Sequence, residues 1–145
     1  MPRDDMMFRP APELREIVRD LKAAHHLMWR LYHINADRIG FFREITCERT
    51  NKVAEVVQLD ALWRSVLGEL GAYWKWIIVV YGYHAERKSI EWLRLVIYHE
   101  LRHIGIDGKK VEHNVEDWRD ILKEFGIEWL DDGNVPDILM AKPTM

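Results

Sequence analysis

The amino-acid sequence predicts an α+β protein, because helix-type and strand-type patterns fall in different stretches of its 145 residues. Apolar residues recur at helical spacing near the N-terminus and twice more in the C-terminal half. The stretch between them contains short β-branched and aromatic runs separated by turn residues, which is typical of strands. We therefore expect an N-terminal helix, a small and mostly antiparallel sheet, and two C-terminal helices.

The composition is that of an ordinary globular protein, with 48% hydrophobic and 31% charged residues. The length suits a single domain, which we place at residues 1–131, followed by a flexible tail at 132–145. The one cysteine, Cys47, excludes an internal disulfide and a zinc ribbon built from cysteine pairs. We expect it to act as a small hydrophobe.

The hydropathy and charge patterns disfavour two classes of partner. The longest apolar run, residues 76–83, is too short to cross a bilayer. Charged residues near the N-terminus stand where a signal peptide would need an apolar block, so we expect a cytoplasmic protein. A net charge of -3 gives no clear signal for nucleic-acid binding, although it is compatible with a local basic patch. No pattern indicates an oligomeric state.

The first predicted helix covers residues 12–34. Pro12 and Glu13 suit its first turn, where the missing proline donor costs nothing and a carboxylate meets the positive end of the helix dipole. An apolar stripe follows at helical spacing, made of Leu14, Ile17, Val18, Leu21, Met28 and Tyr32. Because His25, His26 and His33 have no carboxylate at matching spacing, we expect them to be structural or solvated, with a place in the lining of a site as the alternative.

Three strands are predicted in the middle of the chain. Residues 38–46 and 52–59 form the first two, around a turn at 48–51, which indicates a hairpin. Residues 74–83 form the third, because their β-branched run is too short for a typical helix and is bounded by Gly82. The residues of that run are Ile77, Ile78, Val79 and Val80.

Two further helices follow from capping residues and apolar spacing. Asp60 is a suitable cap for a short helix that Gly71 ends. In the C-terminal part, another helix begins near Asn114 and ends before Gly126. The apolar residues on its inner face are Val115, Trp118, Ile121, Leu122 and Phe125.

The strongest functional signal lies on a helix that Ser89 caps and that runs to Ile104. Near its end stands the sequence His99-Glu100-Leu101-Arg102-His103. Residues four apart lie on one face of a helix, so His99 and His103 can present imidazole nitrogens to one metal ion. Glu100 lies on the apolar face, where an unpaired charge would be costly in a core helix. This pattern indicates a zinc hydrolase in which Glu100 takes a proton from metal-bound water.

A catalytic zinc ion needs a third protein ligand and one position for water. We expect His113 in this role, because it follows a glycine-containing loop long enough to reverse the chain and lies outside the apolar stripe of the next helix. A surface histidine near a helix start is the competing interpretation. Glu116 and Asp117, in the first turn of that helix, are the reserve candidates, and His84 is a weaker one.

Three segments together resemble the phage-type metallopeptidases. They are residues 76–80, the helix with the histidine pair, and the segment His113-Asn114-Val115-Glu116-Asp117-Trp118. The glycine and tryptophan that close the family's chain match Gly126 and Trp129. These proteins are compact zincins, with a general similarity to SprT-like and minigluzincin domains. The resemblance covers residues 25–130.

The resemblance implies a zincin-like fold, with zinc on His99, His103 and His113 and with Glu100 as the base. Asn114 replaces the family's aspartate, which removes a carboxylate that would support a ligand. Histidine ligands also suit iron, cobalt and manganese, so the residues alone do not select zinc.

The predicted reaction is hydrolysis of a peptide bond, with Glu100 passing its proton to the leaving nitrogen. A peptide or protein substrate would lie extended along the exposed edge of the strand at residues 76–83. A donor for the developing oxyanion is also required. The candidates, none of them preferred, are Arg102, Tyr98, Tyr83 and His84.

Three alternatives stay open. One is a non-catalytic zinc-binding interaction module, in which the metal orders the two C-terminal helices. Glu100 argues against it, because a structural site does not need that carboxylate and usually fills its fourth position with a protein ligand. Another is a zinc hydrolase that acts on a non-peptide or DNA-associated substrate, which salt-dependent DNA binding would favour. The third is a nonfunctional remnant.

Overall fold

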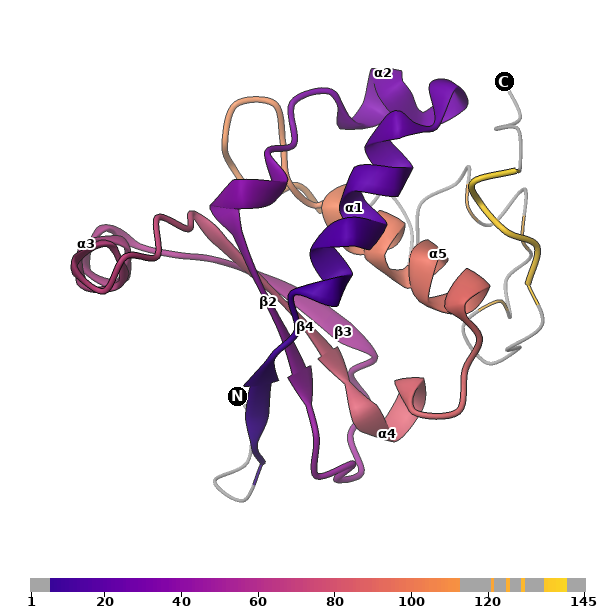
Figure 1. Ribbon diagram of the computed structural model, residues 1–145, viewed down its shortest axis with the longest axis horizontal. Coiled ribbons are helices and arrows are strands. Elements are labelled where there is room, and N and C mark those ends of the chain that lie inside the picture. The colour runs from indigo at the N-terminus through magenta and orange to yellow at the C-terminus, as the bar shows by residue number, and fades with distance from the viewer. Residues whose placement is uncertain (1–5, 113–120, 122–124, 126–128, 130–134, 141–145) are drawn as a thin grey trace. The chain divides into compact units, whose positions relative to one another are not determined.

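The computed structural model describes residues 6–112, 121, 125, 129 and 135–140. It is an α+β structure with a four-stranded mixed sheet, which confirms the predicted class (Figure 1). In chain order the elements are β1 (Phe8–Pro10), α1 (Glu13–Ala23), η1 (His25–Leu27), α2 (Met28–Leu31), η2 (Ala36–Arg38), β2 (Ile39–Glu44), β3 (Ala54–Gln58), α3 (Ala61–Glu69), β4 (Trp76–Tyr81), α4 (Gly82–Ala85) and α5 (Ile90–Leu101).

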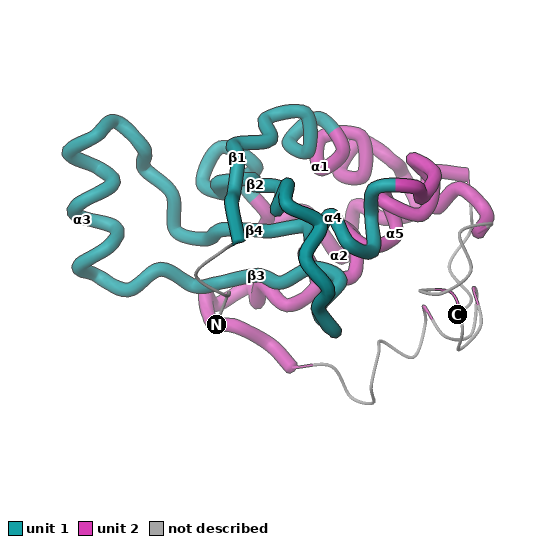
Figure 2. Tube along the Cα trace, turned by 90° about the horizontal axis from the view of Figure 1, so that it is seen from below, with its two compact units in different colours: residues 1–16, 35–86 teal, residues 17–34, 87–145 magenta. Residues whose placement is uncertain are grey.

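The chain forms two compact units, and each unit combines segments that are distant in the sequence (Figure 2). Unit 1 comprises residues 1–16 and 35–86 and contains the sheet, α3 and α4. Unit 2 comprises residues 17–34 and 87–145 and contains most of α1 together with α2 and α5. The single domain at residues 1–131 stays a prediction.

The sheet of unit 1 has the strand order β1-β2-β4-β3. β2 pairs in parallel with β4, from Ile39 opposite Trp76 to Glu44 opposite Tyr81. The two outer pairs, β1 with β2 and β3 with β4, are antiparallel. Since β4 is apolar on both of its faces and buried over most of its length, a central position between two strands is the one that removes it from water.

Two predictions about the sheet are wrong. The strands β2 and β3 do not form a hairpin, because β4 lies between them. For the same reason β4 has no exposed edge along which a substrate could add itself as a strand. A short connection favours pairing of β2 with β3, but burying both faces of the apolar β4 is the stronger effect. The two strands that are adjacent in the sequence are therefore not adjacent in the sheet.

The N-terminal helix is shorter than predicted. After α1, Ala24 adopts an extended conformation (φ -70°, ψ 117°), and the chain continues through η1 into α2. The interruption moves the buried face by one residue, so that Leu27 and Leu31 are buried whereas Met28 and Tyr32 are exposed. The predicted apolar stripe is therefore correct within α1 and wrong beyond it.

In unit 2, α5 is buried along nearly its whole length. The Ser89 side chain accepts a hydrogen bond from the backbone N–H of Trp92 at 3.2 Å, which confirms the predicted N-cap. The α-helix ends at Leu101, and Ile104, the predicted end, lies in a tighter turn in which its N–H donates to the Leu101 carbonyl. The buried residues of α5 are Trp92, Leu93, Leu95, Val96, Ile97, Tyr98, Glu100 and Leu101.

The predicted C-terminal helix falls mostly outside the described residues. Two residues of its range, Ile121 and Phe125, are described, and both are helical. In the segment 135–140, Asp137 forms an ion pair with Arg94 at 2.8 Å, while the flexible tail at 132–145 stays a prediction. Across the part of the chain that the structure describes, no helix is both long enough and apolar enough to span a membrane.

Candidate metal centre

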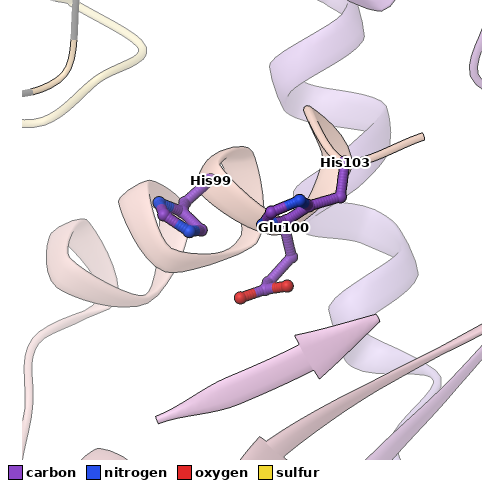
Figure 3. Close-up of side chains that lie close together, drawn as sticks. All are labelled: His99, Glu100 and His103. Atoms are coloured by element: carbon purple, nitrogen blue, oxygen red, sulfur yellow. The ribbon is translucent and has the colours of Figure 1, made fainter. Parts of the chain in front are cut away.

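His99, Glu100 and His103 form a compact cluster at the C-terminal end of α5 (Figure 3). One ligand atom from each side chain lies within 4.8 Å of the others. The two imidazole rings have centroids 5.3 Å apart and are inclined by 65°. Although His103 lies just after the last helical residue, the turn preserves the one-turn spacing from His99 that the sequence predicts.

The ring of His103 is oriented by the backbone of the following loop. Its Nδ1 lies 2.6 Å from the carbonyl oxygen of Val111, and the N–H of Val111 donates to the carbonyl of His103 at 2.6 Å. An Nδ1–H that donates to a carbonyl leaves Nε2 unprotonated, with its lone pair available for a metal ion. Of the two ring nitrogens of His103, Nε2 is therefore the one with the chemistry of a metal ligand.

The loop that carries Val111 needs glycine at its first turn. The N–H of Gly105 donates to the carbonyl of Lys109 at 2.9 Å, and a Cβ atom on Gly105 would come within 2.7 Å of that oxygen. The close approach returns the chain to the end of α5, where Ile104 forms a bridge with Lys110. This confirms the predicted chain reversal, whereas the carbonyl contact from Val111 had no signal in the sequence.

The ring of His99 lies beside Trp129. Their centroids are 6.2 Å apart, and Trp129 is only 2% exposed. An aromatic ring packed at this distance restricts the positions that the imidazole can take. In the sequence, Trp129 was singled out only by the family resemblance. Its contact with His99 is known from the structure alone.

Burial sets the electrostatic character of the cluster. Glu100 is 8% exposed and His103 is 7% exposed, so most of the surface of both side chains is removed from water. A carboxylate in such a position is stabilised by a nearby cation. Two imidazoles and a carboxylate are also donors that zinc and similar divalent ions accept, so the residues fit a metal ion.

Among the described residues, the cluster contains none of the other predicted ligands. His113, Glu116 and Asp117 lie outside the described residues, so the third ligand stays a prediction. In unit 1, the Nε2 atom of His84 lies 2.6 Å from the carbonyl oxygen of Thr50, which gives that histidine a different partner.

Two of the three N-terminal histidines have structural contacts within unit 2. The Nε2 atom of His26 lies 2.8 Å from the carbonyl of Ile138, and that of His33 lies 2.7 Å from the carbonyl of Ile104. His25 is exposed. These contacts support the structural or solvated roles expected for them.

The candidate oxyanion donors differ in their surroundings. Tyr98 is 2% exposed, and the guanidinium of Arg102 lies 5.8 Å from the centre of its ring. In unit 1, Tyr83 is 47% exposed and packs edge-on against His84. None of these contacts identifies an oxyanion donor.

Two titratable groups of unit 1 have displaced pKa values. A hydrogen bond to Glu86, followed by burial, raises the pKa of Cys47, whose Sγ lies 3.4 Å from that carboxylate. Burial, then the hydrogen bond that its hydroxyl donates to Glu55 at 2.8 Å, raises the pKa of Tyr81. A thiol held protonated is a poor metal ligand and nucleophile, so neither activity is assigned to Cys47.

A model of the family described as putative phage metallopeptidase matches residues 6–138. No curated protein and no solved structure matches the chain. The matched range includes the whole sheet, α5 and all three clustered residues. Since it covers most of the sequence, the chain belongs to the phage metallopeptidase family.

Proposed function

We propose that this protein is a zinc-dependent peptidase in which His99 and His103 hold the metal ion and Glu100 is the general base. The observation that carries the proposal is the grouping of their ligand atoms within 4.8 Å in a largely buried setting. Membership of a metallopeptidase family supports the reaction class. Zinc is the ion that this pattern of histidines and glutamate most often holds.

Each residue has a separate task in this proposal. A bound divalent ion supplies Lewis acidity, which lowers the pKa of a coordinated water to about 7 and polarises a carbonyl. Glu100 accepts a proton from the attacking water and delivers it to the leaving nitrogen, so that the amine departs neutral. The carbonyl of Val111 keeps the His103 ring in one orientation throughout, and Trp129 limits the movement of His99.

His113 is the third ligand in this proposal. The loop after α5 brings Val111 back to His103 through two hydrogen bonds, and His113 follows shortly afterwards in the sequence. A ligand at this position requires no long excursion of the chain. Glu116 and Asp117 remain the reserve candidates.

The proposal is tested by separating metal binding from catalysis. Purified wild-type protein is expected to hold about one equivalent of zinc and to cleave an unstructured protein such as casein until a chelator is added. Glu100→Gln should keep the metal and lose at least about 100-fold in kcat/KM, because only the proton transfer is removed. His99→Ala should lose both metal and activity.

Glu91→Gln is the matched control, since it makes the same change in the first turn of α5, away from the cluster along the helix. It should leave metal content and cleavage unchanged. Metal retained by His99→Ala would show that the site is wrong. Wild-type protein that holds zinc but cleaves nothing would instead favour the non-catalytic interaction module.

A further inference from the structure

A pocket of about 320 Å³ in unit 1 is lined by cationic and aromatic side chains. Three cations line it, Arg38, Arg64 and Lys75, together with the rings of Tyr73 and Trp74. The rest of its lining comes from Ala61 and Ser65 of α3, and no carboxylate takes part. The pocket shares no residue with the cluster on α5 and has a different chemistry.

The backbone that carries the pocket is fixed on both sides. The N–H of Lys75 donates to the carbonyl of Arg38 at 2.8 Å, and the carbonyl of Lys75 accepts from the N–H of Leu59 at 3.0 Å. The Arg38 guanidinium donates to the carbonyl of Tyr73 at 3.1 Å. These bonds connect the segment before β4 to the end of η2 and to the residue that follows β3, so the backbone that carries the cations is held in place before a ligand binds.

Trp74 forms a rigid wall of the pocket. A Cβ atom on Gly40 would lie 2.4 Å from the Trp74 ring, so the indole fits only because residue 40 has no side chain. The indole also packs edge-on against Phe42, with 5.8 Å between the ring centroids. Tyr73, by contrast, is 64% exposed, and its ring is accessible to a ligand.

The positive charges of the pocket are not neutralised by the described part of the chain. Arg64 and Lys75 take part in no ion pair or side-chain hydrogen bond there, and the one side-chain bond of Arg38 goes to a neutral carbonyl. The mutual repulsion of three like charges around one pocket disfavours folding. Such an arrangement becomes favourable when an anion occupies the pocket.

We propose that this pocket binds single-stranded nucleic acid. Guanidinium and ammonium groups bind phosphate oxygens, and exposed aromatic rings stack on unpaired bases. Arg64 and Lys75 contact the backbone phosphates, and Tyr73 stacks on a base. Arg64, Tyr73 and Lys75 are exposed, so a ligand in solvent can reach them. α3, which carries Arg64, stands apart from the four strands in both views (Figures 1 and 2). The net charge of -3 hides this feature, because it averages the local cations with acidic residues elsewhere.

The test measures binding of a short fluorescein-labelled oligothymidylate to the full chain by fluorescence anisotropy over a range of salt concentrations. Arg64→Ala/Lys75→Ala should weaken binding at least about 10-fold and reduce the slope of log Kd against log salt by about 1.4, the value for two lost phosphate contacts. Arg64→Ala alone should give about half of that change in slope. Both side chains are exposed, so the variants should fold like wild type.

The matched control is Arg49→Ala/Arg87→Ala. Both arginines are exposed and lie outside the pocket, Arg49 in unit 1 and Arg87 at the start of unit 2. Their removal changes the net charge by the same amount. This pair should leave the affinity within about twofold of wild type, because long-range charge is screened by salt. An equal loss in both pairs would overturn the proposal, since it would show general charge attraction.

Tyr73→Leu separates base stacking from phosphate binding. It should weaken oligothymidylate binding at least about fivefold and leave the binding of heparin, a polyanion without bases, unchanged. No effect of Tyr73→Leu on the oligonucleotide would overturn the proposal, as would the absence of oligonucleotide binding by wild-type protein at low salt.

Discussion

Helices α3 and α5 begin with the same kind of N-cap but differ in how deeply they are buried. Both are capped by a side chain that accepts a hydrogen bond from a tryptophan N–H, Asp60 for α3 and Ser89 for α5. The structure buries no residue of α3, whereas α5 is buried over most of its length. Local sequence signals therefore define where each helix begins, and its surroundings determine what it does.

Because α5 is buried and α3 is exposed, the functional side chains near the two helices lie in different environments. α5 brings a carboxylate and two imidazoles into a setting with little water, where a metal ion and a proton transfer gain most. α3 keeps its side chains in water and contributes Arg64 to a pocket with uncompensated positive charge. We therefore expect catalysis at the end of α5 and ligand binding beside α3.

The largest effect on stability should come from paired tryptophan truncations. Trp92→Ala removes a fully buried side chain from α5 and should lower the free energy of unfolding by about 3–5 kcal/mol. Trp63→Ala removes a side chain of α3 that is 55% exposed and should change it by no more than about 0.5 kcal/mol. Urea denaturation measures both, and similar costs would show that α3 has a packing partner.

Removal of the two caps should have smaller and unequal effects. Ser89→Ala should lower the free energy of unfolding by about 1 kcal/mol, because α5 belongs to the buried core. Asp60→Ala should leave it nearly unchanged and accelerate hydrogen exchange in α3, which can unravel without exposing the core. Ser89→Asp should restore stability. A global loss from Asp60→Ala as large as that from Ser89→Ala would contradict the comparison.

A pH-dependent effect is expected in the sheet of unit 1. Burial alone would raise the pKa of Glu55, but hydrogen bonds from Lys52 and Tyr81 outweigh burial and lower it. The ionised carboxylate therefore stabilises the fold above its ordinary pKa of about 4.3, and this contribution is lost as the pH falls through the lowered value. Wild type should exceed Glu55→Gln in stability at pH 7, and the gap should narrow in acid.

Glu69→Gln supplies the control for this titration. Glu69 lies at the end of α3 and is exposed, and in the described part of the chain its side chain has no hydrogen bond or ion pair. Urea midpoints of this variant and of wild type should stay parallel between neutral and acid pH. A gap for Glu55→Gln that widens in acid would reverse the sign and refute the assignment.

The sequence predicted features that depend on nearby residues. The cap at Ser89, the strand around Ile78 and the spacing of His99 from His103 each follow from side chains within one or two turns of each other. The position of β4 between β2 and β3 did not follow, because strand order depends on which strand must be buried on both sides. The break at Ala24 was also missed, since an alanine carries no signal for ending a helix.

The site likewise has parts that nearby residues predict and parts that depend on the fold. The side chains of the cluster have a recognisable spacing, so all three were found. The partner of His103 is the carbonyl of Val111, and every residue carries a carbonyl, so no pattern could single it out. The cationic pocket combines residues from the end of η2, from α3 and from the segment before β4, which only the fold brings together.

In the proposed site, His99 and His103 hold a catalytic zinc ion beside Glu100. The most direct test is a crystal structure of the zinc-loaded chain, with anomalous diffraction measured at the zinc absorption edge. We expect one peak about 2.1 Å from the Nε2 atom of His103 and from a ring nitrogen of His99, with His113 as the third protein ligand. Zinc bound only at other residues, or no anomalous peak between the two histidines, would contradict the claim.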